Sequence, residues 1–197
     1  VRALVVADID DWTRGGLALV PVSINAAPVE FMRDNYAERL LRQLEKAGIA
    51  PSRIELEVTE QTLDERGSLL VIRALHILRK AGIRVALDDF GTGHSSLTRL
   101  RDFPVDCLKI DSNMVGNFGR DPAITAVVNA IGQIGPALSL ELVAEGIETP
   151  EQCQMLAAAG FKIGQGHLFS KAVNAQSIAQ MLAPASSEAL KAQTQLA

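Results

Sequence analysis

The chain has 197 residues, of which 48% are hydrophobic and 21% charged, and its formal net charge is −4 at pH 7. These values are typical of a globular domain, and the negative charge argues against a surface that binds nucleic acid polymers. No apolar run approaches the roughly 20 residues that span a bilayer, and the first residues do not resemble a signal peptide. We therefore expect a cytoplasmic domain. Because the sequence lacks an initiator Met, we also expect a longer protein, whose upstream region could provide a membrane anchor.

Apolar periodicity, with glycine or proline at the boundaries, predicts six strands that alternate with helices. The strands are expected at residues 19–25, 53–59, 84–89, 105–111, 138–144 and 161–164. The helices are expected at residues 1–17, 27–47, 61–81, 95–100, 123–134, 150–159 and 174–182. Residues 1–182 would form one partial domain, and the small and polar residues 183–197 a frayed tail.

Alternating strands and helices indicate parallel strands joined by crossover helices, as in a doubly wound sheet or a (β/α)8 barrel. Polar residues stand at or near the C-terminal ends of the predicted strands, where the catalytic groups of such barrels meet. These residues are Asn25, Glu57, Asp88, Asp89, Lys109, Glu145 and Gln165. We therefore predict an α/β fold of the TIM-type (β/α)8 barrel, with roughly the first two of its eight strands missing from this chain.

The stretch Val85–Leu97, VALDDFGTGHSSL, combines a strand end, two adjacent carboxylates and a turn bracketed by glycines. Two neighbouring carboxylates repel each other, so we expect a positive group beside Asp88 and Asp89. Two divalent cations that share one aspartate would supply this charge, and two-metal sites suit phosphoester displacement. An acidic turn that caps the next helix is the simpler alternative.

Six motifs occur in order along the chain: SIN at 23–25, ELEVTE at 55–60, VALDDFGTGHSSL at 85–97, LKID at 108–111, VAEGIET at 143–149 and GQGHLFSKA at 164–172. This series resembles the EAL domain family, the bacterial phosphodiesterases of cyclic di-GMP. The resemblance implies a barrel of the EAL kind that hydrolyses cyclic di-GMP to linear pGpG. It also implies that sensory or diguanylate-cyclase-like domains can precede the chain.

The resemblance implies a set of metal ligands. Asn25, Glu57 and Asp88 match ligands of one Mg²⁺ or Mn²⁺ ion, and Asp88, Asp89 and Glu145 match ligands of a second. All of these are oxygen ligands, which hard cations prefer. Ca²⁺ is expected to inhibit. Considered without the resemblance, Asn25 could be a turn residue and Glu145 a helix cap.

Three further residues match family positions. Lys109 matches the lysine that holds and polarises the attacking water, and Gln165 a glutamine near that water and the phosphate; with Glu145 they form the expected catalytic set. Glu60 matches the glutamate that braces the DDFGTG loop. Family dimers form through this loop and the segment after it, here residues 95–120, so a homodimer is expected. Lys109 could instead be a simple ion-pair partner of Glu57.

The chain also departs from the family pattern. The strand that carries the family's Glu-Ala-Leu segment is missing, so its metal-binding glutamate and a nearby substrate-binding arginine have no counterpart. Ala27, His94 and Ala172 replace the family's serine, tyrosine and proline. A non-catalytic EAL-type receptor of cyclic di-GMP is therefore the alternative function, and a fragment that does not fold alone is a third possibility. We expect the 197-residue chain by itself to be a poor enzyme.

Overall fold

The computed structural model describes residues 2–32, 35–64, 68–91 and 97–183. The chain divides into two units: unit 1 comprises Val1–Ala86 and Val173–Ala189, and unit 2 comprises Leu87–Ala172 and Leu190–Ala197. Asn25, Glu57 and Glu60 therefore belong to unit 1, and the other candidate site residues belong to unit 2. From residue 184 onward, the predicted tail lies outside the described residues.

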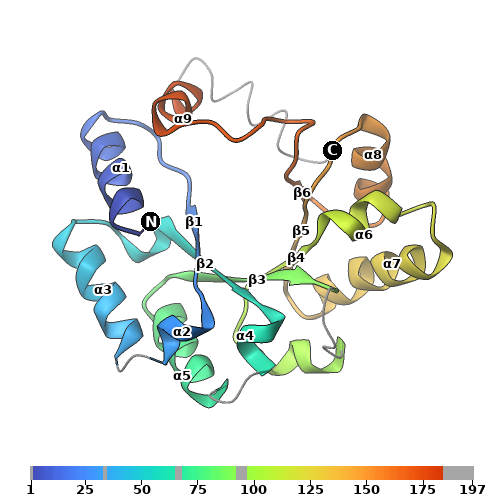
Figure 1. Cartoon of the computed structure of the whole chain (residues 1–197), viewed down its shortest axis with the longest axis horizontal. Helices are drawn as coiled ribbons and strands as arrows, with labels where there is room; N and C mark the ends of the chain where they lie inside the picture. The colour runs from blue at the N-terminus through green and yellow to red at the C-terminus, as the bar shows by residue number, and fades with distance from the viewer. Residues whose placement is uncertain (1, 33–34, 65–67, 92–96, 184–197) are drawn as a thin grey trace. The chain divides into compact units, whose positions relative to one another are not determined.

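In the part of the chain that the structure describes, six strands alternate with helices, as predicted (Figure 1). They are β1 (Val22–Asn25), β2 (Ile54–Thr59), β3 (Arg84–Phe90), β4 (Cys107–Ile110), β5 (Glu141–Ala144) and β6 (Ile163–Gly164), hydrogen-bonded in this order. The pair β1–β2 in unit 1 and the pairs β4–β5 and β5–β6 in unit 2 are parallel. The C-terminal end of each strand lies within one residue of its predicted position, because turn residues mark these ends clearly. At the N-terminal ends the prediction was less accurate: β1 and β5 begin three residues, and β4 and β6 two residues, later than predicted.

The helices of unit 1 are α1 (Arg2–Arg14), α2 (Pro28–Phe31), α3 (Tyr36–Lys46), α4 (Glu60–Asp64), α5 (Ser68–Lys80) and α9 (Ala175–Leu182), with a 3-10 turn, η1, at Pro51–Arg53. The prediction of one helix over 27–47 was wrong. Asn35 has a left-handed backbone with a φ of 60°, which a helix interior does not accept, so α2 and α3 are separate. Of the helix predicted over 61–81, the structure describes α4 and α5, and residues 65–67 lie outside the described residues.

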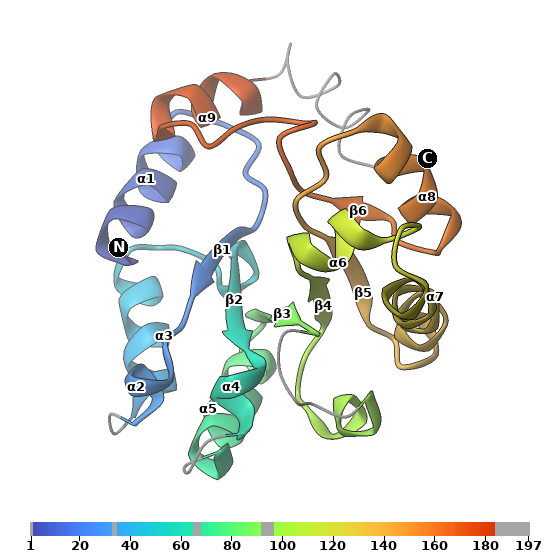
Figure 2. The same ribbon diagram turned by 45° about the vertical axis from the view of Figure 1, so that its right-hand side comes forward.

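Unit 2 contains α6 (Ser112–Asn117), α7 (Pro122–Ala137), α8 (Pro150–Ala158) and a 3-10 helix, η2 (Leu97–Asp102). The predicted helix after the DDFGTG turn is thus a 3-10 helix where it is described, and residues 92–96 lie outside the described residues. The short helix α6 was not predicted. Figures 1 and 2 show it beside the ends of β4 and β5, and the Asp111 side chain caps it.

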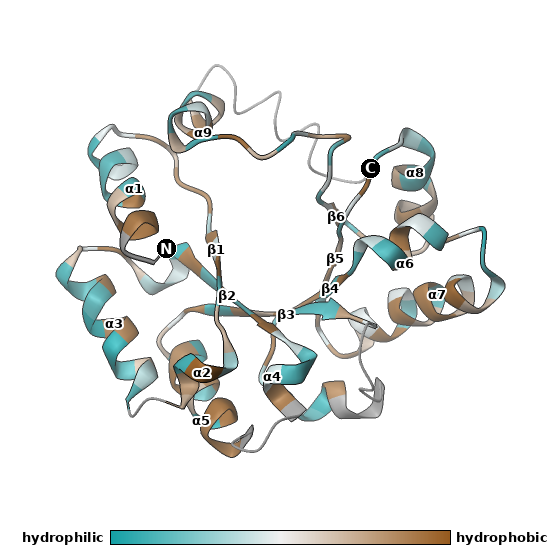
Figure 3. Ribbon diagram, viewed as in Figure 1, coloured by the Kyte–Doolittle hydropathy of each residue, from teal (hydrophilic) through white to brown (hydrophobic). Residues whose placement is uncertain are grey.

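Each unit has its own buried apolar residues. In unit 1, α3 and α5 contact each other and bury Leu44 and Leu78 completely. In unit 2, Val128 of α7 is also buried completely, and Leu108 of β4 is 1% exposed. Figure 3 shows hydrophobic residues along α5 and α7. Among the described residues, no helix is both long and apolar enough to cross a membrane.

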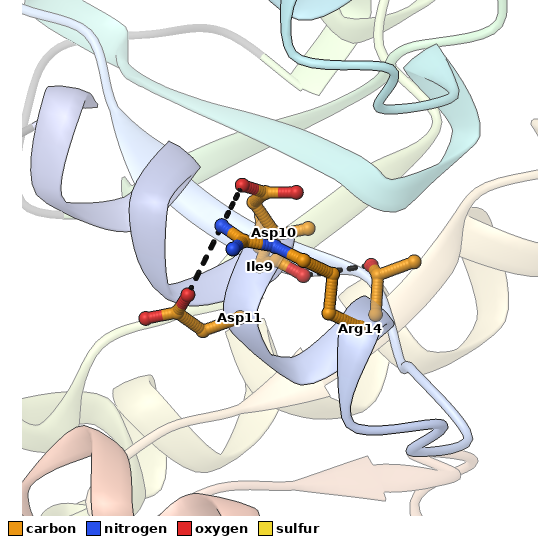
Figure 4. Close-up of polar contacts among 5 residues, drawn as sticks. Ile9, Asp10, Asp11 and Arg14 are labelled. Carbon is orange, nitrogen blue, oxygen red and sulfur yellow. Dashed lines mark hydrogen bonds and ion pairs between the residues drawn. The ribbon is translucent and has the colours of Figure 1, made fainter.

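The last turn of α1 carries charges on its exposed side (Figure 4). The Arg14 guanidinium forms an ion pair with Asp10 and a second, at 3.2 Å, with Asp11. The hydrogen bond and charge of Asp10 raise the pKa of Arg14 above its ordinary value. Pairs with this spacing on a helix surface add little to stability, so α1 depends on its buried residue Ile9 for its place in unit 1.

Candidate metal centre

Three carboxylates of unit 2 converge. Asp88 and Asp89 lie near the end of β3, Glu145 directly follows β5, and one oxygen from each lies within 4.8 Å of the other two. Asp88 and Glu145 are partly buried, whereas Asp89 is exposed. Three carboxylate oxygens this close together match the ligand set that hard divalent cations take. The donor chemistry of the cluster therefore fits such a metal ion.

The backbone of Asp89 explains how two adjacent residues can both join the cluster. Successive side chains of a regular strand point to opposite faces, so Asp88 and Asp89 would normally diverge. Asp89 instead has a φ of 54°, in the left-handed region that aspartate tolerates better than most residues. Its N–H donates to Asp88 Oδ1 at 3.0 Å. The alternation is thereby broken, and both carboxylates reach the same site.

A buried lysine faces the cluster. Lys109, near the end of β4, is 5% exposed, and its Nζ lies 3.5 Å from Asp88 Oδ1 and closer still to Glu145 Oε1. A buried ammonium is costly unless it is paired, and here two carboxylates offset that cost. Lys109 thus has Asp88 and Glu145 as partners in the structure, whereas the prediction without the family resemblance considered only Glu57.

The electrostatics of the cluster favour a cation. The pKa of the Asp89 carboxyl is raised above its ordinary value by desolvation and by the negative charges of Asp88 and Asp111, whereas Lys109 lowers it. Asp111 is a residue that the sequence analysis did not single out. It accepts hydrogen bonds from the N–H groups of Met114 and Asn113, at 3.0 and 3.1 Å, and so caps α6. The sequence feature that could have predicted this cap is an aspartate, a preferred N-cap residue, directly before Ser112 and Asn113.

The backbone places Gln165 beside Glu145 in the ladder of unit 2. The Gln165 N–H donates to the carbonyl of Ala144 at 2.8 Å, and the Gln165 carbonyl accepts from Ile147 at 3.0 Å. The Glu145 N–H donates to the carbonyl of Ile110 at 3.0 Å. Both residues directly follow their strands, and the Gln165 side chain is exposed. Its amide is therefore accessible to a ligand.

Helix α8 does not need Glu145 as a cap. Thr149 is its N-cap, and the Thr149 Oγ1 accepts from the N–H of Gln152 at 3.3 Å. The Gln152 side chain in turn accepts from the N–H of Thr149 at 3.0 Å, which completes a capping box. The alternative role of Glu145 as the cap of this helix is therefore wrong.

In unit 1, Asn25 and Glu57 are partners in the register of β1 and β2. The Glu57 side chain is 7% exposed, and Asn25 is exposed at the last position of its strand. Glu60 is also buried, at the first position of α4.

Glu55, also in β2, has a different environment from Glu57. Its carboxylate accepts a hydrogen bond from Ser23 Oγ at 3.0 Å and forms an ion pair with Arg84 at 3.2 Å. Glu55 is therefore a structural residue of the sheet.

Comparisons with known proteins give a consistent result. The family model of the EAL domain matches residues 1–172 of this chain. MucR of Pseudomonas aeruginosa, a bifunctional diguanylate cyclase and cyclic di-GMP phosphodiesterase, is 33% identical over 169 residues, which are 85% of this chain and 24% of MucR. NbdA of the same organism, a cyclic di-GMP phosphodiesterase, is 36% identical over 150 residues, 76% of this chain and 19% of NbdA.

Several solved structures are similar to the structure of this chain. The cyclic di-GMP complex of the PaMucR phosphodiesterase has a TM-score of 0.80 and 31% identity, and the match covers 88% of this chain and 70% of that one. A manganese and cyclic di-GMP complex of Klebsiella pneumoniae BlrP1 has a TM-score of 0.78 and 29% identity, over 86% of this chain and 43% of that one.

The chain spans about a fifth of the length of the curated relatives that it matches. Within that span, its parallel strands and intervening helices match the barrel of solved EAL domains, which confirms the predicted fold class. The chain belongs to the EAL domain family.

Proposed function

We propose that the protein containing this chain hydrolyses cyclic di-GMP to linear pGpG with the help of divalent metal ions. The observation that carries the proposal is the cluster of Asp88, Asp89 and Glu145 with Lys109 against it. MucR and NbdA, which are similar to this chain over most of its length, are cyclic di-GMP phosphodiesterases. A BlrP1 structure with manganese and cyclic di-GMP supports a divalent metal as cofactor.

Asp88, Asp89 and Glu145 would hold the metal through their carboxylate oxygens. A divalent ion in such a site lowers the pKa of water and neutralises charge on phosphoryl oxygens. In the proposed reaction, a water oxygen bonds to phosphorus, one P–O3′ bond breaks, and the 3′ oxygen takes a proton. The product keeps its second phosphodiester and gains a 5′-phosphate, as in pGpG.

The chain's own residues supply positive charge and orientation. Lys109 is held in place by Asp88 and Glu145, so its ammonium is already oriented when a substrate arrives. Preorganised positive charge is most effective where negative charge develops, here on the phosphoryl oxygens and the attacking water. Gln165, exposed just after β6, would donate its side-chain N–H to a phosphate oxygen.

Several finer assignments also belong to this proposal. Asn25 and Glu57 would act as metal ligands, and Glu60 would brace the DDFGTG loop, as the family resemblance implies. Mg²⁺ or Mn²⁺ would support turnover, and Ca²⁺ would permit binding without it. A homodimer through the DDFGTG loop and the segment after it, and a cytoplasmic location, are proposed on the same basis.

Calorimetric titration of cyclic di-GMP into the full natural protein tests the proposal, first in Ca²⁺ and then in Mg²⁺, with the product separated by chromatography. Binding in Ca²⁺ and pGpG formation in Mg²⁺ are the expected results. Binding in both ions without any product would instead identify a receptor. Absence of binding in both ions would refute the proposal altogether.

A further inference from the structure

The short helix α6 contacts both turns that follow the carboxylates of the cluster. On one side is Gly91, two residues after Asp89 and with a φ of +97°; a Cβ atom on it would lie 2.4 Å from Met114 Sδ. On the other side is Gly146, directly after Glu145 and with a φ of +74°; a Cβ atom there would lie 2.4 Å from the Cβ of Ser112. Real Cβ atoms do not approach so closely, so both turns lie directly against α6.

Helix α6 is itself fixed close to the cluster. It begins three residues after Lys109, and the Asp111 carboxylate between them caps its first turn. Met114 is 5% exposed and Val115 is 1% exposed, so one side of the helix is buried in unit 2. The segment that bears Lys109 and the turns that bear Asp89 and Glu145 therefore share this one helix as a common support.

We propose that Met114 and Ser112 are positioning residues that set the spacing between the Asp88–Asp89 pair and Glu145. This inference rests on the proposed metal-dependent function. Neither residue has an atom in the cluster; they act through Gly91 and Gly146, whose missing side chains let α6 approach. Met114 suits this role because its unbranched side chain fills an irregular gap beside a turn.

Truncation of Met114 should therefore weaken metal binding. Met114→Ala removes the thioether that lies against Gly91, so the Asp88–Asp89 turn gains room to move away from Glu145. Changes to residues that orient metal ligands typically cost 10- to 100-fold in metal affinity, and we expect a loss of about tenfold for Mn²⁺. Met114→Leu, which keeps most of the volume, should restore the affinity to within about threefold.

Unit 2 offers a control with the same side chain at a more exposed position, since Met155 is 39% exposed and Met114 is 5% exposed. Met155 lies against another glycine with a left-handed backbone, Gly119, whose φ is +79° and whose Cβ would lie 2.3 Å from Met155 Cε. That glycine belongs to a turn that carries none of the three carboxylates. Met155→Ala thus makes the same truncation over the same kind of turn, and it should leave Mn²⁺ affinity unchanged.

The experiment is calorimetric titration of Mn²⁺ into the full natural protein and these variants, with thermal unfolding recorded without metal. A tenfold loss in Met114→Ala, recovery in Met114→Leu and no change in Met155→Ala are expected. If Met114→Ala does not fold, Met114→Val, which also lacks Sδ and Cε, takes its place with the same expectation.

A double variant adds a readout that a purely structural role would not move. Gly91→Ala pushes a Cβ against Met114, so combining it with Met114→Ala should cost less Mn²⁺ affinity than the two single losses added together. If the parent binds Mn²⁺ and Met114→Ala binds equally well, the positioning role is refuted and the proposed function stands. If the parent itself does not bind Mn²⁺, the proposed function fails and the positioning role fails with it.

Discussion

Replacement of Lys109 by methionine separates two proposed roles of its ammonium. The first is to pair with the Asp88 and Glu145 carboxylates, which stabilises the fold, and the second is to place positive charge beside the substrate phosphate, which favours turnover. The methionine side chain is similar in length but has no charge, so Asp88 and Glu145 lose their shared cation. At 3.5 Å, one such pair corresponds to about 5 kcal/mol of Coulomb energy at an effective dielectric constant of about 20. Desolvation offsets part of this energy, and breaking a buried pair typically costs about 3–5 kcal/mol.

We therefore expect Lys109→Met to lower the free energy of unfolding by about 3 kcal/mol in the presence of EDTA. For a domain of this size, that corresponds to a fall of about 6–12 °C in the melting temperature. Mn²⁺ should restore part of the loss, because it neutralises the carboxylates that the lysine no longer pairs. A tenfold tighter Mn²⁺ affinity in the variant would recover about 1.4 kcal/mol, or roughly half.

Turnover should respond differently from stability. Since the positive charge beside the phosphate is lost, turnover of cyclic di-GMP in Mn²⁺ should fall on the order of a hundredfold or more, although the metal restores stability. Differential scanning calorimetry in EDTA and in Mn²⁺, with product analysis, measures both effects.

The control variant is Arg84→Met, which breaks the 3.2 Å pair with Glu55 outside the cluster. Because the Arg84 side chain is 39% exposed, its loss should cost less, and Mn²⁺ should not alter that cost. If Mn²⁺ left the stability deficit of Lys109→Met unchanged, the idea that the metal ion and Lys109 act on the same carboxylates would be refuted.

Three further predictions follow from the site. Asp88→Asn and Glu57→Ala should each abolish turnover; a variant that retains activity would contradict its assignment as a metal ligand. Thr149→Ala should lower stability by about 1 kcal/mol through loss of the N-cap without changing Mn²⁺ affinity. Glu145→Gln should lower Mn²⁺ affinity and also stability, because it removes a charged partner of the buried Lys109, and thermal unfolding and titration measure both effects. Asp89→Gly should be more stable than Asp89→Ala by about 1 kcal/mol, although both lose Mn²⁺ affinity.

The strand ends could be predicted because they depend on strong local signals. Alternating aliphatic residues, followed by glycine, proline or charged residues, mark where each strand stops, and parallel strands bring those ends to one edge of a sheet. Lys109 and Glu145 were found in this way, since Lys109 stands near the end of a strand and Glu145 directly after one. Their pairing with each other was not predicted, because it depends on which strands become neighbours.

Other features left no periodic signal. Helix α6 is six residues long, which is too short for an apolar stripe, and its evidence in the sequence is the single cap residue Asp111. The break between α2 and α3 depends on the backbone of Asn35, and helical propensity alone does not exclude a continuous helix there. Such conformations are decided by packing around the residue, so the positioning role of α6 emerged only from the structure.

The left-handed backbone of Asp89 is unfavourable for stability but places a second carboxylate at the proposed metal site. A left-handed backbone costs a residue with a Cβ about 1–2 kcal/mol, and glycine avoids this cost. The chain keeps aspartate at this position, and that backbone brings a second carboxylate beside Asp88. Glycine should therefore raise the melting temperature above that of the alanine variant, while neither supplies the oxygen ligand. Equal melting temperatures for the two variants would mean that the turn relaxes once the carboxylate is gone. In that case the left-handed backbone of Asp89 would result from the interactions of its carboxylate with the other two carboxylates and Lys109. The local sequence would then have no preference of its own for this backbone conformation.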